Sequence, residues 1–79
     1  MVKIYTTAGC PYGKQAIHWF VKRAIEPEVI HLTHETKREL LSTLDKTTVP
    51  QIFVNDVHIG GYSDLIKKED EVLTLLQSS

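Results

Sequence analysis

The chain has 79 residues, 42% of them hydrophobic and 24% charged, and its formal net charge is −1. This composition predicts one soluble globular domain, and no apolar run approaches the roughly 20 residues of a membrane-spanning helix. Basic and acidic residues are intermixed, so neither a nucleic acid nor a membrane is expected as a partner, and the first residues do not resemble a signal peptide.

Cys10 is the only cysteine in the chain. A single cysteine excludes an intramolecular disulfide, so we expect the hydrophobic core alone to stabilise a domain that covers residues 1–79. An unpaired thiol also fits a reducing compartment better than an oxidising one, which makes the cytoplasm the expected location.

The first half of the chain predicts a strand, a helix, a strand and a helix. The first strand covers residues 2–5, and the first helix runs from just after Cys10 to about residue 25, before Pro27 interrupts it. The second strand covers residues 29–32 and the second helix residues 35–44. The apolar stripe expected on the first helix consists of Ala16, Ile17, Phe20, Val21 and Ala24.

Trp19 falls outside that stripe, on a flank with Lys22 and Arg23. We expect its ring to lie over the helix or a loop, and contact with a partner is the alternative, because exposed aromatic residues are enriched at interfaces.

The run QIFVNDVHIGG predicts a β-hairpin with strands over residues 52–54 and 57–59 and a turn at Asn55–Asp56. A last helix is expected from about Ser63. The resulting order, β-α-β-α-β-β-α, predicts an α/β fold with a parallel strand pair, an antiparallel hairpin and helices on both faces of a mixed four-stranded sheet. The expected buried set of the last helix is Leu65, Ile66, Val72, Leu73 and Leu76.

Cys10 is expected at the start of the first helix, where unpaired N–H groups and the helix dipole stabilise an anion such as a thiolate. Pro11 fits the first helical position, because its missing N–H would have been unpaired anyway. Lys14 lies one turn further along, so its ammonium group could approach the sulfur. Spacing alone leaves a second interpretation open, in which Cys10 is a small buried hydrophobic residue.

Two further motifs lie far from Cys10 in the sequence. In TTVPQIFV, Pro50 stands just before a buried strand, which is also compatible with an ordinary turn and a trans bond. In IGGYSDL, two glycines permit close backbone approach, and Ser63 and Asp64 could cap the following helix and leave its amides facing an anion. Each motif alone is typical of a simple turn.

Together, CPY after a Tyr-Thr strand end, TVPQIFV and IGGYSDL resemble the glutaredoxin family, closest to its small bacterial type. The resemblance covers essentially the whole chain and implies a thioredoxin-like fold and thiol chemistry with glutathione as co-substrate. It implies a cis bond before Pro50. The residues that it implies for glutathione binding are Lys46, Thr48, Val49, Pro50, Gly61, Tyr62, Ser63 and Asp64. It also implies that Tyr12 flanks the thiol, so Tyr12 joins Pro11 and Lys14, which the helix start places there, as expected support for the Cys10 thiolate.

The chain departs from the family pattern at two positions. Gly13 stands where the dithiol members have a second cysteine, and Thr7 stands where many members have a lysine. The dithiol route is therefore closed, and we expect a monothiol reaction in which Cys10 attacks the glutathione sulfur of a mixed disulfide. The implied partners are glutathione, glutathionylated or disulfide-containing proteins and, indirectly, glutathione reductase, with the chain acting as a monomer.

Two other functions remain compatible with a single cysteine. Some single-cysteine glutaredoxins hold a [2Fe–2S] cluster between two subunits, but their motif resembles Cys-Gly-Phe-Ser, and Pro11 disfavours the cluster by the same resemblance. The chain could also be a glutathione-binding module with little turnover. No metal site is expected at the histidines, because no cysteine or carboxylate set completes one around His31 and His34.

Overall fold

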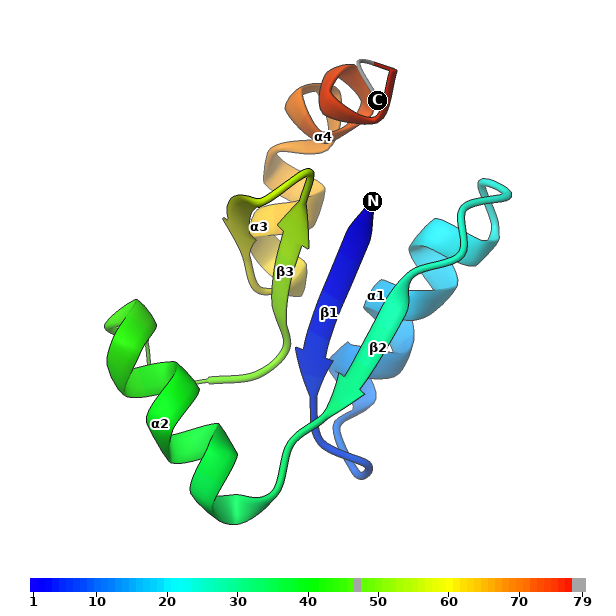
Figure 1. Cartoon of the computed structure of the whole chain (residues 1–79). Helices are drawn as coiled ribbons and strands as arrows, with labels where there is room; N and C mark the ends of the chain where they lie inside the picture. Colours follow the sequence, from blue (N-terminus) through cyan, green and yellow to red (C-terminus); the bar gives the residue numbers. More distant parts are fainter. Residues whose placement is uncertain (47, 78–79) are drawn as a thin grey trace.

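Four strands form one mixed sheet in the order β2-β1-β3-β4 (Figure 1). In the computed structural model, which describes residues 1–46 and 48–77, the strands are β1 (Val2–Thr6), β2 (Glu28–His31), β3 (Gln51–Val54) and β4 (Val57–Gly60). β1 pairs in parallel with β2 and antiparallel with β3, and β3 pairs antiparallel with β4. The predicted mixed sheet is confirmed, including the hairpin turn, where Asn55 and Asp56 both have the positive φ of a type I′ turn.

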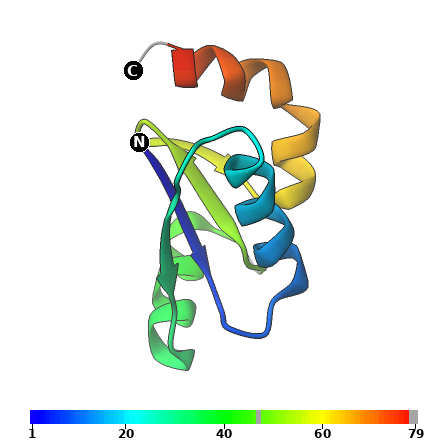
Figure 2. The same ribbon diagram turned by 90° about the vertical axis from the view of Figure 1, so that its right-hand side faces the viewer.

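Helices cover both faces of this sheet, as predicted (Figure 2). Helices α1 (Pro11–Val21) and α3 (Tyr62–Lys67) lie on one face, and α2 (His34–Leu44) lies on the other. α4 (Glu69–Gln77) follows α3 and lies near the β3–β4 turn. Of the helices in the described part of the chain, none is long and apolar enough to cross a membrane.

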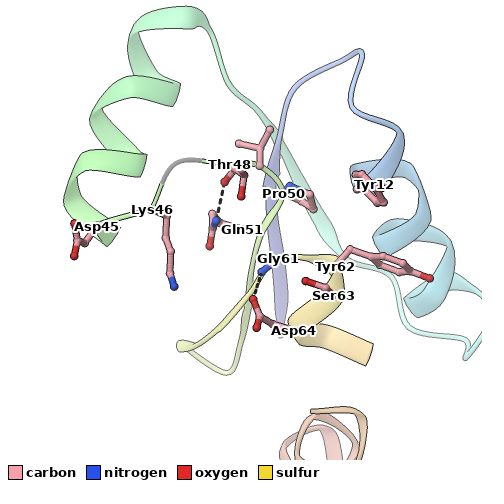
Figure 3. Close-up of a pocket in the computed structure, with 11 residues that line it drawn as sticks. Tyr12, Asp45, Lys46, Thr48, Pro50, Gln51, Gly61, Tyr62, Ser63 and Asp64 are labelled. Atoms are coloured by element: carbon pink, nitrogen blue, oxygen red, sulfur yellow. Dashed lines mark hydrogen bonds between the residues drawn. The ribbon is translucent and has the colours of Figure 1, made fainter. Parts of the chain in front are cut away.

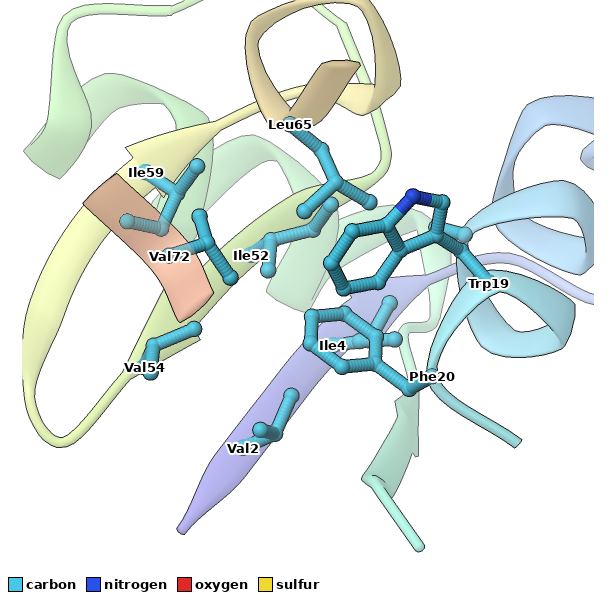
Figure 4. Packing of buried hydrophobic residues seen from close by; sticks show 10 residues of the cluster. Val2, Ile4, Trp19, Phe20, Ile52, Val54, Ile59, Leu65 and Val72 are labelled. Atoms are coloured by element: carbon cyan, nitrogen blue, oxygen red, sulfur yellow. The ribbon is translucent and has the colours of Figure 1, made fainter. Parts of the chain in front are cut away.

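The hydrophobic core lies between the sheet and the α1–α3 layer (Figure 4). Alternate residues of β1 and β3 point into it, because successive side chains of a strand face opposite sides of the sheet. The buried members of this core are Val2, Ile4, Ala16, Trp19, Phe20, Ile52, Val54, Ile59, Leu65 and Val72.

Helix α1 ends four residues earlier than predicted, and its buried face is rotated. The helix ends at Val21, which is 54% exposed. Ala24 lies beyond the helix end, in a left-handed conformation with φ 61°. The expectation that Trp19 lies over the helix or a loop is wrong, because its ring is only 7% exposed and packs edge-on against Phe20. The Arg23 guanidinium lies over the ring, 3.7 Å from its centroid, and shields it from solvent. This cation–π contact lets Trp19 be buried although it lies beside polar positions in the sequence.

The predicted last helix is two helices. α3 ends at Lys67, and α4 begins at Glu69 after a change of direction at Lys68. This change lets Leu65 and Val72 both enter the core, and it leaves Ile66, which was predicted to be buried, 45% exposed.

Candidate functional site

The thiol of Cys10 lies at the N-terminus of α1, with Pro11 at the first helical position as predicted. Cys10 is the N-cap residue, and its sulfur accepts a hydrogen bond from the Gly13 N–H at 3.3 Å. Its S–H can donate to the Val49 carbonyl oxygen, 3.5 Å away. Because the side chain is partly exposed and held by two backbone groups, the interpretation of Cys10 as a buried hydrophobic residue does not fit.

Gly13 allows α1 to begin close to the sheet. It is buried against Thr6 at the end of β1, and a Cβ atom added at position 13 would collide with the Thr6 Oγ1. Thr6 is itself only 2% exposed, so it has little room to move away. At position 13, where dithiol members have a second cysteine, the backbone of the glycine therefore packs directly against Thr6.

The segment before β3 lies opposite the thiol. The Val49–Pro50 bond is cis, as the resemblance implied, and Pro50 is buried. The Val49 carbonyl oxygen faces Cys10, which brings two segments 39 residues apart into contact. The sequence order alone could not place them together.

A pocket of about 540 Å³ adjoins the thiol (Figure 3). It lies where the end of α2, the segment before β3, the start of α1 and the start of α3 meet. All eight residues predicted to bind glutathione line it, together with Tyr12. The lining residues are Tyr12, Asp45, Lys46, Thr48, Val49, Pro50, Gln51, Gly61, Tyr62, Ser63 and Asp64.

Lys14 is not among the residues that line this pocket. It lines a second hollow beside α1, and across residues 1–46 and 48–77 no hydrogen bond or ion pair joins its ammonium group to the Cys10 sulfur, although its backbone N–H donates to the Cys10 carbonyl at 3.3 Å. Its spacing places it one turn beyond the thiol, but its exposed side chain extends along the other side of α1. The structure therefore gives no contact through which Lys14 would support the thiolate.

Two tyrosines form the wall between α1 and α3. The rings of Tyr12 and Tyr62 stack with centroids 6.3 Å apart and an interplanar angle of 29°. Tyr12 is 58% exposed, so this wall offers an aromatic surface beside the thiol. Tyr12 therefore flanks the sulfur as the resemblance implied.

The start of α3 presents a carboxylate and backbone amides to the pocket. The Gly61 N–H donates to Asp64 Oδ2 at 3.1 Å, and Gly60 has φ 118°, a conformation that favours glycine. Gly61 is the N-cap residue and Ser63 lies inside the helix, so the expectation that Ser63 caps it is wrong. Asp64, the third residue of the helix, accepts a hydrogen bond from the N–H of the N-cap residue Gly61, as the third residue of a capping box does.

Sequence reasoning missed a buried polar pair beneath the pocket. The Gln51 side chain is 1% exposed; its Nε2 donates to the Thr48 carbonyl at 2.7 Å, and its Oε1 lies 2.7 Å from His58 Nε2. His58 stacks on Phe53 across the hairpin, with ring centroids 4.9 Å apart. The signal was present in the sequence, since a glutamine directly after Pro50 opens a strand that is otherwise apolar.

The electrostatic environment of His58 favours its neutral form. Burial is the largest cause that lowers its pKa, and the positive charges of Lys46 and Lys68 lower it further. The Asp64 carboxylate opposes this shift but does not reverse it. A neutral His58 that donates from Nε2 to the Gln51 oxygen fits these surroundings.

In the described part of the chain, no group of three or more histidine, cysteine, aspartate or glutamate side chains could hold a metal ion. The arrangement places a thiol beside a pocket that has two carboxylates, those of Asp45 and Asp64, and the ammonium group of Lys46. Such a pocket can take a peptide-like, zwitterionic co-substrate.

Known proteins share both the sequence and the fold. The family model for glutaredoxins matches residues 2–59. Glutaredoxin 1 of Rickettsia prowazekii is 42% identical over 72 residues, which cover 86% of this chain and 76% of that protein. The crystal structure of glutaredoxin 1 from Francisella tularensis in complex with cacodylate has a TM-score of 0.82 and 33% identity, covering 92% of this chain and 95% of that one.

A buckwheat glutaredoxin crystallised with glutathione has a TM-score of 0.84 at 19% identity, covering 98% of this chain and 76% of that one. This likeness concerns the fold alone. The α/β fold described above is thus thioredoxin-like, as the motifs implied.

Proposed function

This chain belongs to the glutaredoxin family of thiol–disulfide oxidoreductases, and from that premise we propose that it reduces glutathione mixed disulfides by a monothiol mechanism at Cys10. The observation that carries the proposal is the position of the only thiol. Its sulfur is held by the Gly13 N–H at the start of α1 and faces the pocket segment at Val49, while Gly13 leaves no second thiol within the helix turn.

The first step is attack by the Cys10 thiolate on the glutathione sulfur of a glutathionylated protein. A new S–S bond forms between Cys10 and glutathione, and the protein–glutathione S–S bond breaks. The electron pair leaves with the protein sulfur, which takes up a proton and is released as a thiol. The Gly13 N–H donates a hydrogen bond to the attacking sulfur and holds it at the start of α1.

In the second step, the thiolate of another glutathione attacks the glutathione sulfur that is bound to Cys10. This step releases glutathione disulfide and regenerates the Cys10 thiolate. Glutathione reductase can then return glutathione disulfide to two thiols outside this protein. No second cysteine of the enzyme takes part, so Gly13 is compatible with turnover.

The pocket supplies groups that match the polar ends of glutathione. Lys46 offers an ammonium group for the glycine carboxylate, and the Asp64 carboxylate and the backbone amides of Tyr62 and Ser63 at the start of α3 suit the γ-glutamyl end. The backbone of Val49 lies between these ends and next to the sulfur, where the cysteinyl part would pair with it. A buckwheat glutaredoxin with this fold has been crystallised in complex with glutathione.

The test is glutathione-dependent reduction of a small glutathionylated disulfide, coupled to glutathione reductase. We expect turnover by the natural chain and none by Cys10→Ser. A matched control moves the thiol: Cys10→Ser combined with Ser42→Cys, on the exposed side of α2, carries one cysteine away from the pocket. Turnover by this control would contradict the proposal, and mass spectrometry should find glutathione on Cys10 alone.

The same proteins separate the other two functions. If the natural chain is folded and binds glutathione but does not turn over, the chain is a binding module. Anaerobic reconstitution with iron and sulfide, followed by visible spectroscopy, would identify a cluster carrier by a glutathione-dependent chromophore in a dimer.

A further inference from the structure

A second hollow, of about 580 Å³, lies between α1 and the start of α3. We call it the α1 groove; its basic and aromatic lining consists of Lys14, His18, Trp19, Lys22, Arg23 and Tyr62. None of these residues is acidic, and α1 as a whole contains no aspartate or glutamate. In a chain with a net charge of −1, this places a concentrated positive charge on one surface.

The ammonium groups of Lys14 and Lys22 in the α1 groove are available to a partner. Lys14, His18 and Lys22 follow one another at four-residue spacing, so they lie on one side of the helix over about 12 Å. Within the described residues, none of these three side chains has a hydrogen bond or an ion pair. Arg23, in contrast, is fixed by Glu69 at 2.9 Å and by the Trp19 carbonyl, so it closes the far end of the groove.

The position of Lys14 does not serve the stability of α1. Lys14 lies in the first turn of the helix, where the helix dipole disfavours a cation, whereas Lys22 is the C-cap residue, where the dipole favours one. Within the described residues, no acidic side chain pairs with Lys14 or Lys22. Their two ammonium groups therefore suit an anionic group from outside the chain.

The α1 groove borders the thiol pocket. Tyr62 lines both hollows, and it stacks on Tyr12 beside Cys10. A protein whose modified cysteine reaches Cys10 therefore has neighbouring residues directly over Tyr62, from where they can extend along α1.

We propose that the α1 groove binds an acidic segment next to the modified cysteine of the protein substrate, an inference that rests on the function proposed above. Aspartate and glutamate side chains of that segment pair with Lys14 and Lys22, while Tyr62 contacts its backbone. Proteins with acidic residues beside the mixed disulfide are then preferred substrates. The selection acts mainly through association, because exposed charge pairs steer an encounter more than they tighten a complex.

The experiment compares two short peptides of equal length, each with one glutathionylated cysteine, flanked by aspartate and glutamate in one peptide and by lysine in the other. We expect a higher kcat/KM for the acidic peptide at low ionic strength and a smaller preference as salt is added. Lys22→Gln should lower kcat/KM for the acidic peptide by about two-fold to five-fold. Lys67→Gln, which removes the same charge from exposed α3, should leave it unchanged.

A small glutathionylated disulfide without charged flanks reports on the proposed function separately. If this small substrate is turned over but the two peptides have the same kcat/KM, the groove proposal is overturned and the enzyme assignment stands. The same holds if Lys22→Gln and Lys67→Gln lower kcat/KM for the acidic peptide equally. If turnover is absent altogether, fluorescence anisotropy of the unmodified acidic peptide tests the groove without catalysis. Binding that Lys22→Gln weakens would support it, whereas no binding, or tighter binding of a single-stranded oligonucleotide, would overturn it.

Discussion

At the scale of single residues, the contact between Gly13 and Thr6 determines how close the thiol lies to the sheet. A glycine inside a helix is normally less favourable than alanine by about 1 kcal/mol. Here the absent Cβ leaves the space that Thr6 Oγ1 occupies, so the usual preference is reversed. The same contact keeps the Gly13 N–H directed at the Cys10 sulfur.

We predict that Gly13→Ala lowers the free energy of unfolding by about 1 kcal/mol, because the added methyl group overfills the site. In a Thr6→Ala background, the same substitution should instead be neutral or stabilising. Urea unfolding of the four proteins of this double-mutant cycle measures the coupling. Equal effects of Gly13→Ala in both backgrounds would contradict the steric explanation.

Lys46 is the residue whose predicted role depends on charge alone. We expect Lys46→Gln to raise the KM for glutathione by about two-fold to five-fold, since an exposed ammonium contributes modestly to binding a carboxylate. The coupled turnover assay measures this at varied glutathione concentration and ionic strength. Lys37→Gln on α2 is the matched control, and an equal rise in that variant would show a general charge effect.

At the scale of elements, Asn55 joins the hairpin turn to the last helix. Its Nδ2 donates to the Leu75 carbonyl at 2.7 Å, which satisfies one of the carbonyls that the end of α4 leaves without an intrahelical partner. Asn55 also has φ 51°, so its backbone suits the turn while its side chain holds α4.

The Asn55 Oδ1 also accepts a hydrogen bond from the N-terminal ammonium group of Met1 at 2.6 Å. Asn55→Gly should therefore keep the turn but lower the free energy of unfolding by about 1 to 2 kcal/mol through loss of both side-chain hydrogen bonds. Asp56→Gly is the matched control: Asp56 has φ 68° and makes no side-chain hydrogen bond within the described residues, so its replacement should be neutral or stabilising. Urea unfolding compares the two variants, and amide exchange in α4 should quicken only in the first. Similar losses in both would place the effect in the turn itself.

Elements defined by local signals were predictable from the sequence. The turn at Asn55–Asp56, the helix start at Pro11 and the end of α2 depend on neighbouring residues, and all lie within a few positions of the prediction. The break at Lys68 was not predictable, because it depends on Leu65 and Val72 entering the same core from two directions. The burial of Trp19 depends likewise on a tertiary contact with α3 and on the Arg23 cover.

At the scale of the whole molecule, the site forms where one end of the sheet collects the ends of several elements. Most of the residues that line the pocket were predicted from the family resemblance, although Asp45 and Gln51 were not, and the contacts between the motifs were not predictable from spacing. The Gln51–His58 pair was missed because it crosses the hairpin and only the folded register brings the two side chains together.

His58 gives the folded protein a pH-dependent stability. Its pKa in the fold lies below the ordinary value of 6.5, because burial and the charges of Lys46 and Lys68 disfavour the protonated ring. The unfolded chain therefore binds this proton more tightly. The contribution of His58 is complete above pH 6.5 and is lost as pH falls through the lower pKa of the fold.

We predict that the stability difference between the natural chain and His58→Gln changes as pH falls from about 8 to about 5. The natural chain should lose its His58-linked stability over this range, so any advantage over the variant should shrink. Urea unfolding at several pH values measures the difference, with His31→Gln as the control for removing an exposed imidazole. A difference that is constant or grows towards low pH would contradict the prediction.

The N-cap position of Cys10 also links the stability of the helix start to the presence of a thiol. Serine, threonine, aspartate and asparagine satisfy helix amides better than other residues do, so a sulfur at this position is a weaker cap than the alternatives. Selection for stability alone would favour a residue with a side-chain oxygen at position 10, whereas thiol chemistry at this position requires cysteine. The thiol proposed as the nucleophile therefore comes with a less stable helix start, and stabilising substitutions have to be sought at other positions.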